Sequence, residues 1–509
     1  MTAPSSLTPI TSRHVARGVG TTLLSRSGSV IEVVSQPLYV AMFGLAGFGL
    51  YSVLWAAINL AENIFDLGMT SAMQRTVPQA KDDAAAAASL RHALLLGVTP
   101  NLLIAVLATA FAPQIAPWLH VAARDAPLVV PAIRLFAWAL PLWAFVEIAT
   151  SALRARHLFG AEIRLRLAYE QIMRLVLAAA LYLAGFGLAG LFIAHLASLS
   201  LTVLLSIRLL ARHYRLDLLF APAPEPLLTG QTMKAGVSVL PANIVARLFG
   251  DLPPILLNML LPGSGGAQAA ALYTIARKLS SLVQMVRTAF SYVLAPLASS
   301  ASRRDLRDVG ALYSYSTRLI TAIVLPLVAA LSAGIRPILQ FFGHDAGIAY
   351  GACLILILAR GLEAILGSAA PVFQVVSAYR RQLLPSIAGV SVALLLAPLL
   401  VPLSPLSGMA ASVACGLLLA AAIPVLLLHR HQHIHPFREG FARTAAVALA
   451  ISAAAAALAW SATLLPRGAA LAAILLVALG AIWSTCRFAL AEADRRTLGK
   501  TGRALRLVG

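Results

Sequence analysis

Polar side chains follow one face of a long apolar segment at residues 268–295. Five of them recur at the spacing of one side of a helix: Arg277, Ser281, Gln284, Thr288 and Ser291. Lys278 and Arg287 flank this row. Lysine and arginine suit phosphate because their charge-assisted hydrogen bonds to it persist away from bulk water. The pattern predicts an anion-binding face, since so many polar positions on one side exceed what helix packing alone requires.

Three further apolar segments carry polar rows of their own. These rows are Arg26, Ser29, Glu32 and Gln36 in residues 18–41; Asn59, Glu62, Asp66 and Thr70 in residues 48–71; and Asn243, Arg247, Asp251 and Asn258 in residues 236–261. We expect Pro253-Pro254 to break the last of these segments. An ionisable group that faces lipid costs a few kcal/mol or more, so such groups normally face a bundle interior or a wet cavity. We therefore expect the four segments to line one polar cavity.

The sign of the charges differs between the halves of the chain, with more acids in the first and more bases in the second. The bases predicted to bind an anionic headgroup are Arg26, Arg247, Arg277, Lys278 and Arg287. The acids predicted to bind a coupling proton or sodium ion are Glu32, Glu62, Asp66 and Asp251. The uncharged polar residues predicted to line the cavity are Asn59, Asn243, Ser281, Gln284 and Thr288. Helical spacing leaves one alternative open, in which Arg247–Asp251 and Arg360–Glu363 are ion pairs that only hold helices together.

The composition predicts the elements that position these residues. Of 509 residues, 60% are hydrophobic and only 11% are charged, and the mean hydropathy is +0.85. Soluble globular proteins are roughly 25% charged, so a water-soluble enzyme is excluded. Apolar segments long enough for about 14 transmembrane helices lie at residues 18–41, 48–71, 93–117, 127–151, 167–186, 189–209, 236–261, 268–295, 317–341, 350–376, 382–403, 408–428, 444–464 and 468–488.

The positions of the basic residues set the expected orientation. With both termini in the cytoplasm, most of the 39 Lys and Arg residues fall in the inner loops, and the outer loops hold only Arg124 and Arg467. This bias is the positive-inside pattern of membrane proteins. The net charge of +20 is therefore explained by topology in the lipid bilayer, without a nucleic-acid partner.

An internal repeat suggests how the segments are organised. Leu50-Tyr51-Ser52 opens the second segment, and Leu272-Tyr273-Thr274 opens the eighth. Six segments separate the two, so both halves start from the cytoplasm and the repeat is parallel. We expect an all-α polytopic membrane protein in which two six-helix lobes form a parallel pseudo-two-fold repeat, with two C-terminal helices added. The expected parts are 1–210 (first lobe), 211–234 (cytoplasmic linker), 235–429 (second lobe), 430–443 (His-rich cytoplasmic loop) and 444–509 (two extra helices and a basic tail).

Other motifs give no catalytic or cofactor site. His429, His431, His433 and His435 alternate in an inner loop, where helical spacing would align 429 with 433 and 431 with 435, but a polar loop is the better interpretation than a metal site. The "GKT" at 499–501 lacks the first glycine of a phosphate-binding loop. We expect no cofactor, no metal and no enzymatic reaction.

Three stretches resemble a known family. "GLAGFGLYSVLWAAINLAENIFDLGMTSAMQR" (44–75), "ALYTIARKLSSLVQMVRTAFSYVLAPLAS" (271–299) and "VFQVVSAYRRQ" (372–382) look like the corresponding regions of Wzx-type flippases. These proteins belong to the multidrug/oligosaccharidyl-lipid/polysaccharide exporter superfamily. The resemblance implies two lobes around a central cationic cavity, in the bacterial inner (cytoplasmic) membrane.

The implied activity is the movement of an undecaprenyl-diphosphate-linked oligosaccharide, such as an exopolysaccharide or O-antigen repeat unit, from the cytoplasmic to the periplasmic leaflet. It would proceed by alternating access coupled to an ion, with the polysaccharide polymerase machinery as a further partner. The main alternative is a cation-coupled drug or metabolite antiporter of the same superfamily, which would favour acidic and aromatic cavity linings. A membrane glycosyltransferase or ligase is a third possibility, but it would need larger outer loops than this chain has.

Overall fold

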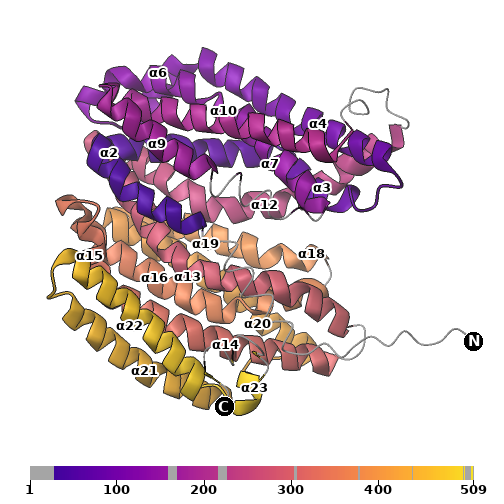
Figure 1. Ribbon diagram of the computed structural model, residues 1–509, viewed down its shortest axis with the longest axis vertical. Helices are drawn as coiled ribbons and strands as arrows, with labels where there is room; N and C mark the ends of the chain where they lie inside the picture. Colours follow the sequence, from indigo (N-terminus) through magenta and orange to yellow (C-terminus); the bar gives the residue numbers. More distant parts are fainter. Residues whose placement is uncertain are drawn as a thin grey trace, which may run out of the picture. The chain divides into compact units, whose positions relative to one another are not determined.

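The computed structural model describes residues 28–156, 158, 165, 169–215, 226–302, 306–376, 379–437 and 440–496, together with 498, 502, 506 and 507. These residues form helices and turns, with no β-strand among them (Figure 1). Ten helices in the described ranges are long and apolar enough to cross a membrane. The predicted all-α polytopic membrane fold is thereby confirmed.

The described helices group by their internal contacts into two units, which lie within Arg26–Ile275 and Ala276–Gly509. We call Arg26–Ile275 the N-terminal unit and Ala276–Gly509 the C-terminal unit. The lobe boundaries expected from the internal repeat stay a prediction.

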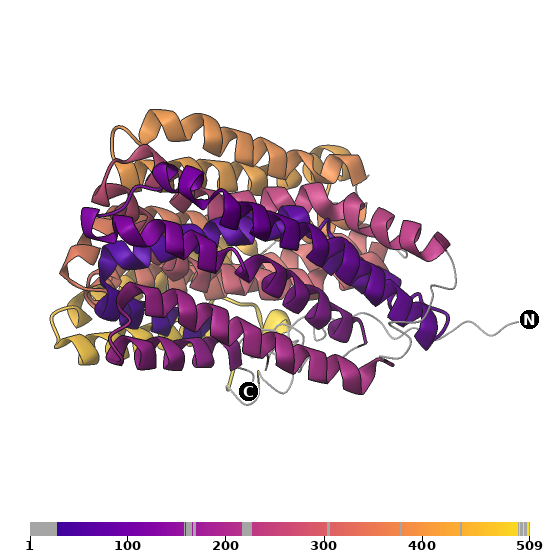
Figure 2. The ribbon, with the colours of Figure 1, turned by 90° about the horizontal axis from the view of Figure 1, so that it is seen from above.

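The axes of the helices of the N-terminal unit lie roughly parallel to one another, as Figure 2 shows in indigo to magenta. Their bounds are α2 (Gly28–Phe65), α3 (Met69–Thr76), α4 (Asp83–Ala110), α5 (Ala112–Ile115), α6 (Ala126–Phe136), α7 (Ala139–Ala155), α9 (Glu170–Leu183), α10 (Gly187–His213) and α12 (Pro226–Leu260). Short 3₁₀ helices, η1 (Ala116–Trp118) and η2 (Ala123–Asp125), connect α5 to α6.

The C-terminal unit begins inside α13 (Ser264–Ser302). Its other helices are α14 (Leu306–Ala333), α15 (Ile335–Gln340), α16 (Tyr350–Leu366), α17 (Ala369–Val376), α18 (Tyr379–Gln382), α19 (Leu384–Leu400), α20 (Pro405–Gln432), α21 (Phe441–Ala462), α22 (Arg467–Phe488) and α23 (Glu492–Arg496), with the 3₁₀ helix η4 (His344–Ala349) before α16. Each apolar segment expected from the sequence is therefore mostly helical over its described part.

Glycines mark two breaks in the first two segments. The segments at 18–41 and 48–71 join in α2, which kinks at Gly44, where φ is 75° and ψ is 160°. A second break separates α2 from α3, because Leu67 and Gly68 both adopt positive φ. Such φ values are costly for residues other than glycine. The break reorients the chain directly after Asp66.

The helix α12 differs from expectation, since it continues through Pro253-Pro254 without an interruption. Proline is tolerated inside membrane helices when neighbouring helices accommodate the freed backbone carbonyl groups. Glycines bring α12 and its connection to α13 close to the first helices. A Cβ added to Gly68 would collide with the carbonyl of Gly236, and one added to Gly49 would collide with that of Ala267. Glycine is thus required at both of these contacts.

In the C-terminal unit, α21 and α22 pack side by side against α14 (Figure 1). Small side chains form the interface: Ala330, Ala459, Ala462 and Ala478, with Ile474 as the larger member. Thr485 of α22 donates a hydrogen bond to the carbonyl of Ala322 on α14. Small residues allow this close approach of backbones, which is a common basis of helix association in membranes.

Candidate functional site

The polar row predicted on residues 277–291 lies along α13 on its more accessible side. Arg277, Lys278 and Arg287 are half-buried, as are Ser281, Gln284 and Thr288 of the same row. The apolar positions Leu279, Val283 and those that follow on the opposite side are buried. Arg277 and Lys278 each take part in interactions within the protein. The sequence therefore predicted correctly that these bases share one helix, and α13 presents them on its less buried side.

The hydroxyl groups of this row bond to their own helix. Ser281 donates to the carbonyl of Lys278 at 2.6 Å, and Thr288 donates to that of Gln284 at 2.9 Å. Such bonds to the preceding turn satisfy the hydroxyl donors locally. The hydroxyl groups of Ser281 and Thr288 therefore spend their donors on their own helix.

Arg287 is held by an acid on α16. Its Nη2 lies 3.4 Å from Oε1 of Glu363, while Nη1 of Arg360 donates to Oε2 of the same carboxylate at 2.7 Å. Glu363 and Arg360 are buried, and the Arg287 side chain is 25% exposed. Two guanidinium groups around one carboxylate leave a net positive charge. Arg360 and Glu363 therefore form the ion pair that their helical spacing allowed.

The predicted row on α12 makes polar contacts within the N-terminal unit. Asn243 donates to Oγ of Ser71 at 3.1 Å, and Asn258 donates to the carbonyl of His120 at 2.7 Å. Among the described residues Arg247 has no hydrogen bond or ion pair, so the alternative in which Arg247 pairs with Asp251 does not hold. Arg247 remains a half-buried base. It lies in the N-terminal unit, whereas the bases of α13 lie in the C-terminal unit.

The structure describes the side chains of three of the four predicted ion-binding acids. Glu62 is 2% exposed, Asp66 4% and Asp251 3%, and Asn59 is buried beside Glu62 on α2. Arg26 lies outside the described residues. Glu32 belongs to α2, but its side chain also lies outside the described part. The polar cavity expected between the four segments stays a prediction.

Sequence reasoning missed a buried network around Arg174. Its Nη1 donates to the Tyr51 hydroxyl at 3.2 Å, and its Nη2 lies 3.1 Å from Oε1 of Glu170. The Tyr51 hydroxyl is 2.9 Å from Nδ1 of His195, which is fully buried. The ring of Trp55 lies 4.3 Å from that of His195. The spacing of Glu170 and Arg174 on α9 could have indicated their pair. Tyr51 and His195 could not be found in this way, because α2 and α10 meet α9 only through tertiary packing.

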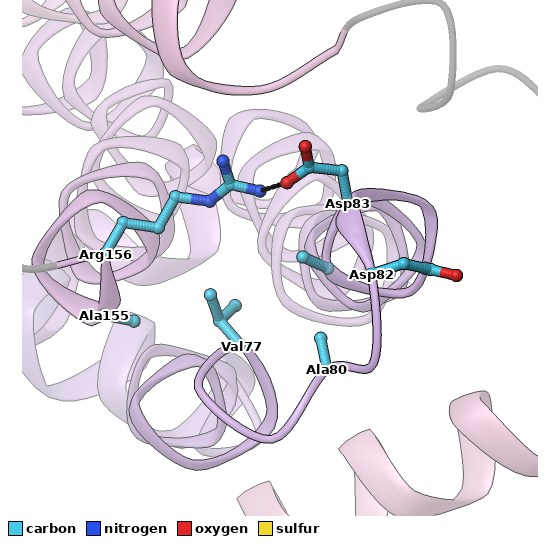
Figure 3. A pocket seen from close by; sticks show the side chains of 7 residues that line it. Val77, Ala80, Asp82, Asp83, Ala155 and Arg156 are labelled. Carbon is cyan, nitrogen blue, oxygen red and sulfur yellow. Dashed lines mark hydrogen bonds and ion pairs between the residues drawn. The ribbon is translucent and has the colours of Figure 1, made fainter.

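A pocket of about 410 Å³ lies where α3, α4 and α7 meet, and Figure 3 shows its lining. Arg156 crosses it to reach Oδ1 of Asp83 at 2.8 Å, donates to the carbonyl of His213 at 2.6 Å and stacks 4.0 Å from the Tyr214 ring. Burial raises the pKa of the Tyr214 hydroxyl, against the opposing effect of Arg156. Arg156 thereby ties the ends of α4 and α10 together. None of the predicted site residues lines this pocket.

The His-rich segment does not continue as one helix, so the alignment that a metal site would need is absent among its described residues. Helix α20 ends at Gln432, and His433 adopts a left-handed conformation with φ of 54°. The rings of His429 and His435 lie 5.7 Å apart as a result. Within the described residues, no group of three or more His, Cys, Asp or Glu side chains could hold a metal ion.

The fold matches solved structures of membrane transporters over most of the chain. A multidrug resistance MATE family transporter of the MOP superfamily, in an inward-facing conformation, matches with a TM-score of 0.66, at 15% identity over 81% of this chain and 96% of that one. The lipid II flippase MurJ, in an inward closed conformation, matches with a TM-score of 0.70, at 11% identity over 91% and 97%. A MATE transporter of Vibrio cholerae gives 0.63, at 14% identity over 83% and 98%. The chain therefore shares the fold of these solved structures.

A sequence model of one family covers more than half of the chain. The family is described as "Polysaccharide biosynthesis protein", and it matches residues 42–344. The chain belongs to this family, which confirms the resemblance noted on the sequence. No curated protein sequence matches the chain.

Proposed function

We propose that this protein is a flippase that moves an undecaprenyl-diphosphate-linked oligosaccharide from the cytoplasmic to the periplasmic leaflet. It would act by alternating access in the bacterial inner membrane, with both termini in the cytoplasm. Membership in the polysaccharide biosynthesis family and the MurJ-like fold support a lipid-linked substrate. The polysaccharide polymerase machinery is then the natural recipient of the product.

The observation that carries the proposal is the basic face of α13. Three half-buried bases, Arg277, Lys278 and Arg287, occupy one helix, and the partly accessible Arg287 shares its acid with Arg360. A diphosphate cannot cross a hydrocarbon layer of roughly 30 Å unaided, because an isolated ion there costs tens of kcal/mol before relaxation. Fixed bases reduce that cost while the prenyl chain stays in lipid.

The test is transfer of a fluorescent undecaprenyl-diphosphate oligosaccharide across liposomes that contain the purified protein. We expect the wild type to expose the probe on the opposite leaflet. Arg277→Ala, Lys278→Ala and Arg287→Ala should each slow transfer by about tenfold or more, since a hydrogen bond to a charged group contributes about 1.5–3 kcal/mol. Arg277→Lys and Arg287→Lys should restore part of the rate, because they keep the charge.

Arg336→Ala is the matched control. Arg336 is also an arginine of the C-terminal unit, but it stacks against the rings of Tyr350 and Trp460, at 5.7 and 5.5 Å. Its loss should leave transfer near the wild-type rate. If the wild type transfers no lipid but exchanges drugs or metabolites under an ion gradient, the protein is an antiporter and the flippase proposal is wrong. If all the α13 variants transfer lipid at the wild-type rate, the protein is a flippase but its substrate does not bind at the bases of α13.

A further inference from the structure

Several segments of the chain meet at one end of the helix pair α21 and α22. Oγ1 of Thr444, in the first turn of α21, donates to the carbonyl of Ala489, just after α22, at 3.1 Å. This contact brings Arg443, the exposed neighbour of Thr444, to the end of α22. Figure 1 shows α23 at the same end of the two helices.

Two hydrogen bonds add further bases to this end. Nη1 of Arg495 on α23 donates to the carbonyl of Arg487, on the last turn of α22, at 2.7 Å. Nη1 of Arg487 donates to the carbonyl of Leu507 at 2.7 Å, so Leu507 and its exposed neighbour Arg506 lie at the same place. We call Arg443, Arg487, Arg495 and Arg506 the basic cluster. Because its members come from four separate segments, the cluster is built by the fold and not by one run of basic sequence.

The acids of this region do not neutralise the basic cluster. Among the described residues after position 440, the acids are Glu492 and Asp494. Glu492 pairs with Arg496 at 2.5 Å, and Asp494 pairs with Arg318 of α14 at 2.8 Å. Within the described part of the chain, no member of the basic cluster forms an ion pair. Four positive charges therefore remain at this end, and they attract a ligand that carries negative charge.

An apolar stripe on α22 leads to the basic cluster. Leu476, Leu479 and Trp483 are exposed, and their spacing of three and four residues places them on one face of the helix. Arg487 follows Trp483 by one turn on that face, and the exposed ring of Phe488 lies 6.4 Å from the indole. Tryptophan is enriched at the level where lipid headgroups meet acyl chains. The order along this face is thus the order within a lipid molecule, from apolar through interfacial to charged.

We infer that the basic cluster and this stripe bind an anionic diacyl phospholipid, such as phosphatidylglycerol, with the phosphate group at the arginines. Guanidinium groups suit phosphate because they offer several N–H donors in one plane. The buried Nε of Arg495 has no acceptor among the described residues, and a phosphate oxygen would satisfy it. The acyl chains would lie along Leu476 and Leu479. The inference does not rest on the proposed flippase activity; only its assignment to the inner leaflet rests on the proposed topology.

Charge and shape together decide between the possible occupants. A zwitterionic headgroup brings an ammonium group that needs an acid, and both described acids here are paired with arginines. A free phosphate ion would leave the exposed stripe unused. The lipid-linked substrate of the proposed function must move through the bilayer, whereas Arg487 is tied to the fold through both its side chain and its carbonyl. A resident anionic phospholipid is the occupant that fits all of these features.

The position of the site gives the lipid a structural role. Arg443, Arg487 and Arg495 belong to α21, α22 and α23, so one headgroup among them would connect three helices. Thr444 and Ala489 form a single hydrogen bond between the first two. A ligand that binds only the folded state stabilises it, and we therefore expect the end of this helix pair to be held more firmly when the lipid is present.

The test measures the contact of Trp483 with lipids of defined charge. The purified protein is placed in phosphatidylcholine nanodiscs that contain rising fractions of phosphatidylglycerol brominated on its acyl chains, which quenches nearby tryptophan fluorescence. The part of the quenching that is missing from Trp483→Phe belongs to this site. We expect half of that part at a mole fraction about tenfold lower for brominated phosphatidylglycerol than for brominated phosphatidylcholine. Molar salt should reduce the difference, because it screens exposed charges.

Arg443→Gln should weaken the preference for phosphatidylglycerol about fivefold, which is the effect of one base near an anionic surface. Arg443 forms no hydrogen bond or ion pair with the described residues, so its replacement should leave the fold intact. Arg467→Gln is the matched control. Arg467 is also exposed and begins the same helix, roughly 30 Å away along its axis, and its loss should leave the preference unchanged.

Equal quenching of Trp483 by the two lipids in the wild type would overturn the inference, whether or not any variant folds. Full preference in Arg443→Gln would show that the basic cluster is not its source. Inorganic phosphate should have no effect; if it abolishes the preference, the cluster is a site for free phosphate and the lipid inference is wrong. Displacement of phosphatidylglycerol by an equal amount of undecaprenyl phosphate would assign this surface to the proposed substrate and would also overturn the inference.

Discussion

Nη2 of Arg287 lies 3.4 Å from Oε1 of Glu363, so a predicted substrate-binding base is tethered by an acid of its own unit. Glu363 also accepts from Arg360 at 2.7 Å. An anionic ligand would therefore compete with Glu363 for Arg287, while Arg360 keeps the acid neutralised. This arrangement allows Arg287 to change partners without leaving a buried carboxylate uncompensated.

Glu363→Gln should destabilise the C-terminal unit. The substitution leaves two guanidinium groups facing each other with no acid between them, and breaking a buried ion pair costs about 3 kcal/mol. Thermal unfolding can be followed with a thiol-reactive fluorophore, because Cys353 and Cys486 are buried, after exposed Cys415 is replaced by serine. Glu492→Gln is the control; its partner Arg496 is exposed, so we expect a loss below about 1 kcal/mol. Equal midpoints for the two variants would contradict this.

Asp494→Asn should release the C-terminal helix α23 from α14. The carboxylate of Asp494 forms a bidentate pair with Arg318, with both N–O distances at 2.8 Å. We expect faster amide hydrogen exchange in residues 492–496, from the loss of a contact that contributes about 1.5–3 kcal/mol. Arg318→Asp combined with Asp494→Arg should recover part of the protection. Unchanged exchange in the single variant would show that α23 is held by other contacts.

Gly68→Ala should unfold or strongly destabilise the N-terminal unit. A side chain there must adopt φ of +75° and also collide with the carbonyl of Gly236, for a combined cost of about 3 kcal/mol or more. Gly185 has φ of +84° but open space around its Cβ position. Gly185→Ala should therefore cost only about 1 kcal/mol, and the difference between the two melting temperatures isolates the close contact. Similar melting temperatures for the two variants would show that the contact of Gly68 with Gly236 does not require glycine.

Tyr51→Phe should weaken the network around Arg174. It removes the hydroxyl that accepts from Arg174 at 3.2 Å and contacts His195 at 2.9 Å. A buried polar group left unsatisfied costs about 1–3 kcal/mol. The same change at exposed Tyr182, which contacts Phe43 by its ring, should be almost neutral in thermal unfolding. A neutral Tyr51→Phe would mean that water replaces the hydroxyl.

Hydropathy alone predicted the helical segments because a membrane helix must be apolar over its own length, which is a local property. Tertiary partners are not local. Arg318 lies near the start of the expected segment at 317–341, yet it pairs with Asp494, which lies far along the chain. Likewise, Thr70 and Ser151 belong to different apolar segments, and only the structure brings them within hydrogen-bond distance.

The alanine-lined interface of α14 with α21 and α22 has a consequence for handling this protein. Lipid tails are as apolar as these side chains, so the three helices associate through close fit and the bond of Thr485 to Ala322, and gain little from excluding water. We expect small, short-chain detergents to insert between these helices and separate them. Long-chain detergents or native lipid discs should therefore preserve the last two membrane helices during purification, and the choice of amphiphile becomes part of any experiment on this protein.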